Sequence, residues 1–279
     1  MLLCSGAPDV VFAARAISSV AAVPARETPL RKDRNVTSAI RVPAAVLLPG
    51  TGSDEVFVRA VFGGPLRALG VPLIAPPPPP GAELAEGYLK TLDALADEYG
   101  ELLVGGISFG AHLAAEWAVR HPGRCGGLLA ALPAWNGVPG SAPASLAATL
   151  SADLVARSGV DAALAQTAGS PDWLRAELDR AWRRHGGELA AGLRVAAGRP
   201  APTLGDLAAL NVPAGIGTCA DDPIHPTKVA SEWADALPRA ALGETTLTAL
   251  GADRESLGRA TVLAFLKARQ MPGGAPSRP

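Results

Sequence analysis

One stretch of the 279-residue chain has residue types and spacing that could perform nucleophilic chemistry. Gly106, Ser108 and Gly110 form a G-x-S-x-G pattern between the apolar run 102–107 and the helix-compatible segment 109–120. A serine on a sharp turn between a strand and a helix exposes its hydroxyl, and flanking glycines let neighbouring backbone approach closely. The pattern therefore predicts a nucleophilic serine. A glycine-rich turn with an incidental serine is the alternative.

Two further segments follow apolar runs and could serve the same site. The sequence Pro-Gly-Thr-Gly-Ser-Asp at 49–54 is a run of small residues that could turn its backbone N–H groups toward developing negative charge. The segment 217–226 contains Asp221 and Asp222, followed by proline, and a carboxylate there could orient a base. An Asx-Pro turn that caps a helix would explain the second segment equally well.

With these motifs the chain resembles an α/β-hydrolase over residues 40–269. The resemblance implies that Ser108 is the nucleophile and Asp222 the acid, with Asp221 as the second choice for the acid. It also implies an oxyanion hole formed by the backbone N–H groups of Thr51 and Phe109.

The base is the point at which the sequence departs from this family. The resemblance implies a histidine in the loop after the strand that follows the acid loop. That strand is predicted at 245–250, and the chain has Gly251 and Ala252 after it. No histidine occurs after His225. Since an unassisted serine hydroxyl stays protonated at neutral pH, the triad is predicted to be incomplete or non-standard, with weak activity.

The four histidines of the chain offer different prospects as a base. His121 is predicted at a helix end on the surface, and His185 in solvent at the end of a charged helix. His112, one helical turn after Ser108, is predicted to be buried packing. His225 could approach from the acid loop as a base, although a helix-start role fits its place in the loop better.

These segments sit in an alternation of short apolar runs and helical stretches, which predicts a mostly parallel sheet with helices on both faces. The predicted strands are 44–48, 71–75, 102–107, 126–132, 212–220 and 245–250, and the predicted helices of the core are 55–69, 83–99, 109–120, 226–237 and 253–269.

The alternation is interrupted once, which suggests a division of the chain. Residues 41–136 and 200–269 are predicted to form the α/β-hydrolase core, and 137–199 a helical lid insertion. A helical ornament that only packs on the sheet is the alternative for the insertion. Residues 1–40 are an N-terminal segment of uncertain order, and 270–279 a flexible tail.

Composition narrows the class of protein. The net charge is −1 and no charge block occurs, which argues against nucleic-acid binding. The three cysteines lack metal-ligand spacing and favour a reducing compartment, and no apolar run reaches the roughly 18 residues of a membrane span. A cytoplasmic protein without metal or cofactor is predicted, and its oligomeric state is left open.

The resulting hypothesis is a serine hydrolase that acts on an ester or similar small acyl substrate. Trp173 and Trp182 in the insertion hint at an apolar acyl portion. The competing hypothesis is a catalytically impaired protein of the same fold that binds a small apolar ligand or a protein partner.

Overall fold

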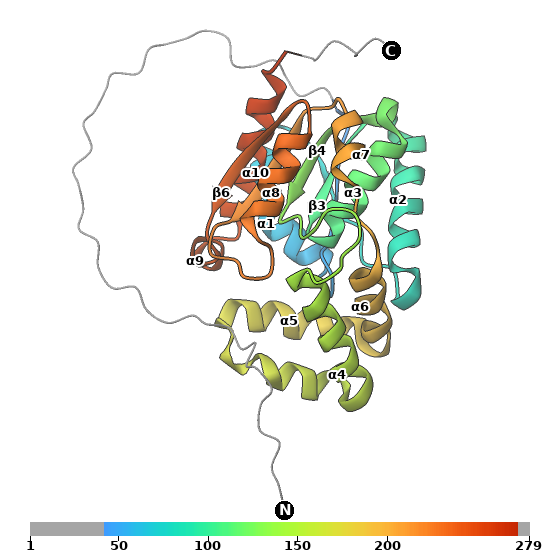
Figure 1. Cartoon of the computed structure of the whole chain (residues 1–279), viewed down its shortest axis with the longest axis vertical. Coiled ribbons are helices and arrows are strands. Elements are labelled where there is room, and N and C mark those ends of the chain that lie inside the picture. Colours follow the sequence, from blue (N-terminus) through green and yellow to red (C-terminus); the bar gives the residue numbers. More distant parts are fainter. Residues whose placement is uncertain (1–41, 273–279) are drawn as a thin grey trace, which may run out of the picture.

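The computed structural model describes residues 42–272. The predictions for residues 1–40 and for most of the tail 270–279 lie outside the described residues. Within the described range, six strands form one parallel sheet in the order β2-β1-β3-β4-β5-β6 (Figure 1). The strands are β1 (Ala45–Leu48), β2 (Leu73–Ile74), β3 (Leu102–Ile107), β4 (Cys125–Ala131), β5 (Ala214–Cys219) and β6 (Ala240–Thr245). The predicted fold class is confirmed.

The sheet is covered on both faces because its central strands bury alternate residues on opposite sides. In β1, Val46 and Leu48 join one hydrophobic cluster, while Ala45 and Leu47 join the other. The first cluster is completed by α2 (Leu84–Tyr99), α3 (Phe109–Arg120), α7 (Leu204–Ala209) and α8 (Thr227–Ala236), and the second by α1 (Glu55–Ala68), α9 (Leu247–Ala252) and α10 (Glu255–Arg269). Three layers result, with the sheet in the middle.

Residues 137–199 contain three α-helices, two short 3-10 helices (Gln166–Gly169 and Gly186–Glu188) and no strand. The α-helices are α4 (Pro143–Ala165), which is interrupted at Gly159, α5 (Asp172–His185) and α6 (Leu189–Gly198). They share a small apolar cluster of their own, which includes Trp182 and Leu193. In Figure 1 the three helices gather at one end of the sheet, the end at which β6 leads into α9.

The last predicted strand is wrong. The sequence predicts a strand over 245–250, but β6 ends at Thr245 and α9 begins at Leu247. The Thr246 side chain accepts a hydrogen bond from the Ala249 N–H, and Asp221 accepts one from the Leu247 N–H at 2.6 Å. Capping of two N-terminal N–H groups stabilises a helix at this position. No helix in the described part of the chain is long and apolar enough to cross a membrane.

Candidate active site

Ser108 lies on the sharp turn that the sequence predicts. β3 ends at Ile107, α3 begins at Phe109, and Ser108 between them has φ 54° and ψ −116°. A non-glycine residue rarely adopts a positive φ, so this backbone is strained. A Cβ at Gly106 would lie 2.5 Å from the Leu48 carbonyl oxygen, which explains why glycine precedes the turn.

The loop after β1 packs against this turn. A Cβ at Gly110 would lie 2.2 Å from the Leu48 oxygen, and one at Gly50 would lie 3.5 Å from the Ser108 Cβ. The loop that carries Thr51 therefore lies against the start of α3, where Phe109 provides the first helical N–H. This arrangement is compatible with the two backbone donors that the sequence analysis assigns to an oxyanion hole.

The loop after β5 brings a carboxylate and an imidazole to the serine. Asp222 Oδ2 lies 2.8 Å from His225 Nδ1, and His225 Nε2 lies 2.9 Å from Ser108 Oγ. Asp222 Oδ1 also accepts hydrogen bonds from the backbone N–H groups of Ile224, at 2.8 Å, and His225, at 3.2 Å. The side chains of Asp222 and His225 are 6% and 16% exposed. The three side chains form one continuous hydrogen-bonded chain.

The charge state of Asp222 follows from its partners. Burial raises the pKa of this carboxyl, but the hydrogen bond and charge of His225 and the two backbone N–H groups outweigh burial and lower the pKa below its usual value. A carboxylate can only accept hydrogen bonds, so the proton of a neutral His225 resides on Nδ1. His225 Nε2 is then free to accept the proton of the Ser108 hydroxyl.

His225 does precede a helix start, since α8 begins at Thr227, but its imidazole also contacts Ser108. Residues 222–225 form a tight turn in which Asp222 Oδ1 accepts the backbone N–H of residues two and three positions later. This turn brings the His225 imidazole within hydrogen-bond distance of the Asp222 carboxylate. The Asp-Pro-x-His spacing at 222–225 is the sequence feature that indicates this arrangement. The same spacing also fits an ordinary Asx turn at a helix cap, so it does not by itself predict a base. Asp221, the second choice for the acid, instead accepts a hydrogen bond from the Leu247 N–H.

The remaining histidines lie outside the hydrogen-bonded chain. His112 is 2% exposed, as expected of a packing residue, and its Nε2 accepts a hydrogen bond from the Ala134 N–H at 2.9 Å. Burial, followed by the nearby charge of His225, lowers the pKa of His112 to about 3. His121 is partly exposed beside Asp93.

The prediction that His185 is solvated was wrong. Its Nε2 lies 3.0 Å from the carbonyl oxygen of Ser53, in the loop after β1.

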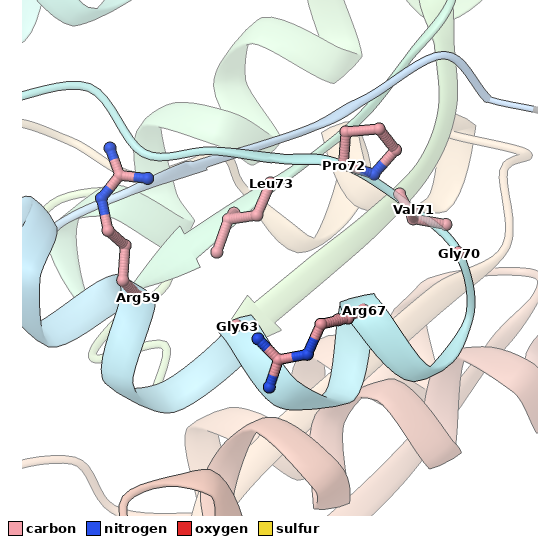
Figure 2. Close-up of a pocket in the computed structure, with 7 residues that line it drawn as sticks. All are labelled: Arg59, Gly63, Arg67, Gly70, Val71, Pro72 and Leu73. Atoms are coloured by element: carbon pink, nitrogen blue, oxygen red, sulfur yellow. The ribbon is translucent and has the colours of Figure 1, made fainter.

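Two cavities of the described structure lie away from Ser108. Figure 2 shows the larger one, of about 460 Å³, between α1 and the segment that leads into β2. It is lined by Arg59, Gly63, Arg67, Gly70, Val71, Pro72 and Leu73. The other, of about 420 Å³, lies where α3 meets the end of the insertion. Neither is lined by a residue of the hydrogen-bonded chain, and no cluster of three or more His, Cys, Asp or Glu side chains within residues 42–272 could hold a metal.

The architecture matches that of known hydrolases, although no family model and no curated protein matches the sequence. An enol-lactonase from Burkholderia xenovorans superposes with a TM-score of 0.64 at 18% identity, over 81% of this chain and 92% of the other. A thermophilic esterase from Thermogutta terrifontis gives 0.58 at 19% identity, over 73% and 80%. An α/β-hydrolase enzyme from a Medee basin deep-sea metagenome library gives 0.59 at 15% identity, over 87% and 94%. The protein has the α/β-hydrolase fold.

Proposed function

We propose that the protein is a serine hydrolase that cleaves an ester or similar acyl substrate. The observation that carries this proposal is the hydrogen-bonded chain from Asp222 through His225 to Ser108, set on a strained turn at the carboxyl end of the sheet. Nucleophile, base and orienting acid within hydrogen-bond distance of one another are the geometric signature of serine catalysis.

Each residue has a defined part in the reaction. Ser108 Oγ attacks the carbonyl carbon while His225 Nε2 takes the hydroxyl proton, and the N–H groups of Thr51 and Phe109 stabilise the oxyanion. When the tetrahedral intermediate collapses, the alcohol departs with the proton from His225 and leaves an acyl group on Ser108. Water then attacks the acyl-enzyme while His225 takes one of its protons. As the second tetrahedral intermediate collapses, His225 returns this proton to Ser108 Oγ, and the carboxylic acid departs.

Asp222 keeps the imidazole of His225 in the tautomer that these reaction steps require, and it stabilises the imidazolium that forms. In this proposal the acid and the base come from one loop, instead of from two successive loops as the resemblance implies. The reason for expecting weak activity, a missing base after the acid loop, then no longer applies. We therefore expect ordinary general-base assistance, worth about 10²–10⁴-fold.

The insertion is proposed to be a lid because α5 contacts both the loop after β1 and the α9 region. The indole of Trp182 lies against Gly52, and that of Trp173 lies against Gly251 beneath the Arg254 guanidinium. Both rings are therefore used in packing the insertion on the core. They lend no support to an apolar acyl group in the substrate.

Hydrolysis of short-chain chromogenic esters tests the proposal with the wild-type protein, Ser108→Ala, His225→Ala and the double variant. Each single variant should lose about 10²–10⁴-fold in kcat/KM. Because the residues act as a unit, the double variant should be no slower than Ser108→Ala. Folded wild-type protein whose turnover is unaffected by Ser108→Ala would contradict the proposal and favour the impaired, ligand-binding alternative.

A further inference from the structure

Helix α5 of the insertion is bonded to the loop that carries Thr51. The Arg180 guanidinium donates two hydrogen bonds to Asp54, from Nε to Oδ2 at 3.0 Å and from Nη2 to Oδ1 at 2.7 Å. Asp54 is 0% exposed, whereas the Arg180 side chain is 34% exposed. A two-point pairing between a guanidinium and a carboxylate fixes direction as well as distance.

Asp54 also terminates that loop. Its Oδ1 accepts hydrogen bonds from the N–H groups of Val56, at 3.1 Å, and Phe57, at 3.2 Å, and so caps α1. Burial raises the pKa of Asp54, but the bonds from Arg180 and from the cap outweigh burial and lower it. The carboxylate is thus held charged by the helix that it caps and by the insertion together.

The neighbours of Asp54 contact the same helix. Trp182 Nε1 lies 2.8 Å from where a Cβ would stand on Gly52, and His185 Nε2 lies 3.0 Å from the Ser53 oxygen. On the other side, Arg184 Nη1 donates to Glu55 Oε1 at 2.5 Å.

Four consecutive residues, 52–55, are therefore bonded to or packed against α5, immediately after Thr51. The position of this loop therefore depends on the position of α5.

The same helix is also linked to α9, the helix that follows β6. Arg180 also pairs with Glu177, which lies 3.8 Å from Arg254. Arg254 Nη1 in turn donates to the carbonyl oxygens of Leu250, at 2.8 Å, and Gly251, at 2.6 Å, in α9. Arg180 stands at the centre of a charged network that spans the carboxyl end of the sheet.

We infer that Arg180 is a positioning residue that acts through Asp54 on the Thr51 loop, so that the oxyanion donor is in place only when α5 is seated. This inference rests on the proposed function, because it assigns Thr51 to the oxyanion hole. The insertion then does more than cover the site. It completes the electrostatic part of the site.

Arg180→Met tests the inference, with Arg183→Met as the matched control on the same helix. Arg183 is 53% exposed, and among residues 42–272 it pairs with Asp161 and Asp179, both within the insertion. Since one oxyanion donor is worth about 10²–10³-fold in kcat, displacement of the loop should lower kcat at least about 10-fold. KM should change little, and Arg183→Met should match the wild type in both constants. Arg180→Lys keeps a positive charge beside the buried Asp54 carboxylate but loses the two-point hydrogen bonding. This variant should fold and give an intermediate kcat.

Hydrogen exchange of the amides at 52–57 gives a second readout that is independent of turnover. These amides should exchange faster in Arg180→Met and in Arg180→Lys than in Arg183→Met. Wild-type kcat and unchanged exchange in folded Arg180→Lys would overturn the inference, as would a selective rise in KM. If the wild type shows no Ser108-dependent turnover, the proposed function fails. Unchanged exchange would then also overturn the coupling between Arg180 and the loop.

Discussion

Asp222 and His225 lie three residues apart on one loop and are joined twice, once through their side chains at 2.8 Å and once through the His225 backbone N–H. The acid and the base are therefore oriented by a single turn. Their geometry does not depend on how two separate loops meet. Only the distance from His225 to Ser108 depends on the packing of β3 against its neighbours in the sheet.

Asp222→Asn tests whether this turn sets the tautomer of the imidazole. The asparagine oxygen can still accept the two backbone N–H groups, so the turn should persist. If its amide donates to His225 Nδ1, the imidazole proton moves to Nε2, which then cannot accept the serine proton. Ester hydrolysis should fall by about 10²–10⁴-fold in kcat/KM at an unchanged Tm. A loss below about 10-fold would show that the acid is elsewhere.

Ala252→His tests whether the loop that the resemblance favours can supply the base instead. Ala252 is exposed at the end of α9, whereas the imidazole of His225 already contacts Ser108. Introduced into His225→Ala, the substitution should restore no ester hydrolysis, and introduced into the wild type it should leave kcat/KM unchanged. Recovery of turnover in the double variant would place the base position at 252.

Gly50→Ala probes the contact between the Thr51 loop and the nucleophile. The new Cβ would lie 3.1 Å from the Ile107 oxygen and 3.5 Å from the Ser108 Cβ, so the loop must shift by a few tenths of an ångström. A displaced oxyanion donor should cost about 10–100-fold in kcat/KM. Gly63→Ala is the control, since nothing lies within 4 Å of its added Cβ. It should keep full activity and raise the free energy of unfolding by up to about 1 kcal/mol. Equal kinetics for the two variants would contradict the assigned contact.

His112 predicts a pH dependence of stability. Its pKa is about 3 in the folded protein, below the usual value near 6.5, so below pH 6.5 the unfolded chain binds a proton that the folded chain excludes. Stability contributed by this group is present above pH 6.5 and is lost as the pH falls toward 3. Between pH 7 and 5 the loss should be about 2 kcal/mol.

His112→Gln keeps an acceptor for the Ala134 N–H without the titration. Urea unfolding at pH 7 and pH 5 should show a smaller drop in stability for the variant by that amount. An identical drop in the two proteins would exclude His112 as its source.

The sequence predicted the parts of the fold that are encoded locally. The run Leu102–Ile107 is apolar throughout and is buried throughout, and the flanking glycines of Ser108 are required by contacts with the Leu48 backbone. Both features leave a pattern that can be recognised without knowledge of distant residues.

Features that depend on tertiary contacts were less predictable. β6 is an edge strand without a strong apolar run, and the helix after it depends on Asp221, 26 residues earlier in the chain. The position of His225 depends on the distance between two loops, 117 residues apart, which no local pattern encodes. The Asp54–Arg180 pair joins residues 126 positions apart, a separation at which no local sequence pattern indicates a contact.

Covalent modification of Ser108 by an organophosphonate is the most direct measurement of the central claim, that His225 activates Ser108. Peptide mass spectrometry should find one adduct, on the peptide that contains Ser108. The second-order rate constant should fall by about 10²–10⁴-fold in His225→Ala, because the reagent is then attacked by an unassisted hydroxyl. An adduct on another residue, or an equal rate constant in folded His225→Ala, would contradict the claim.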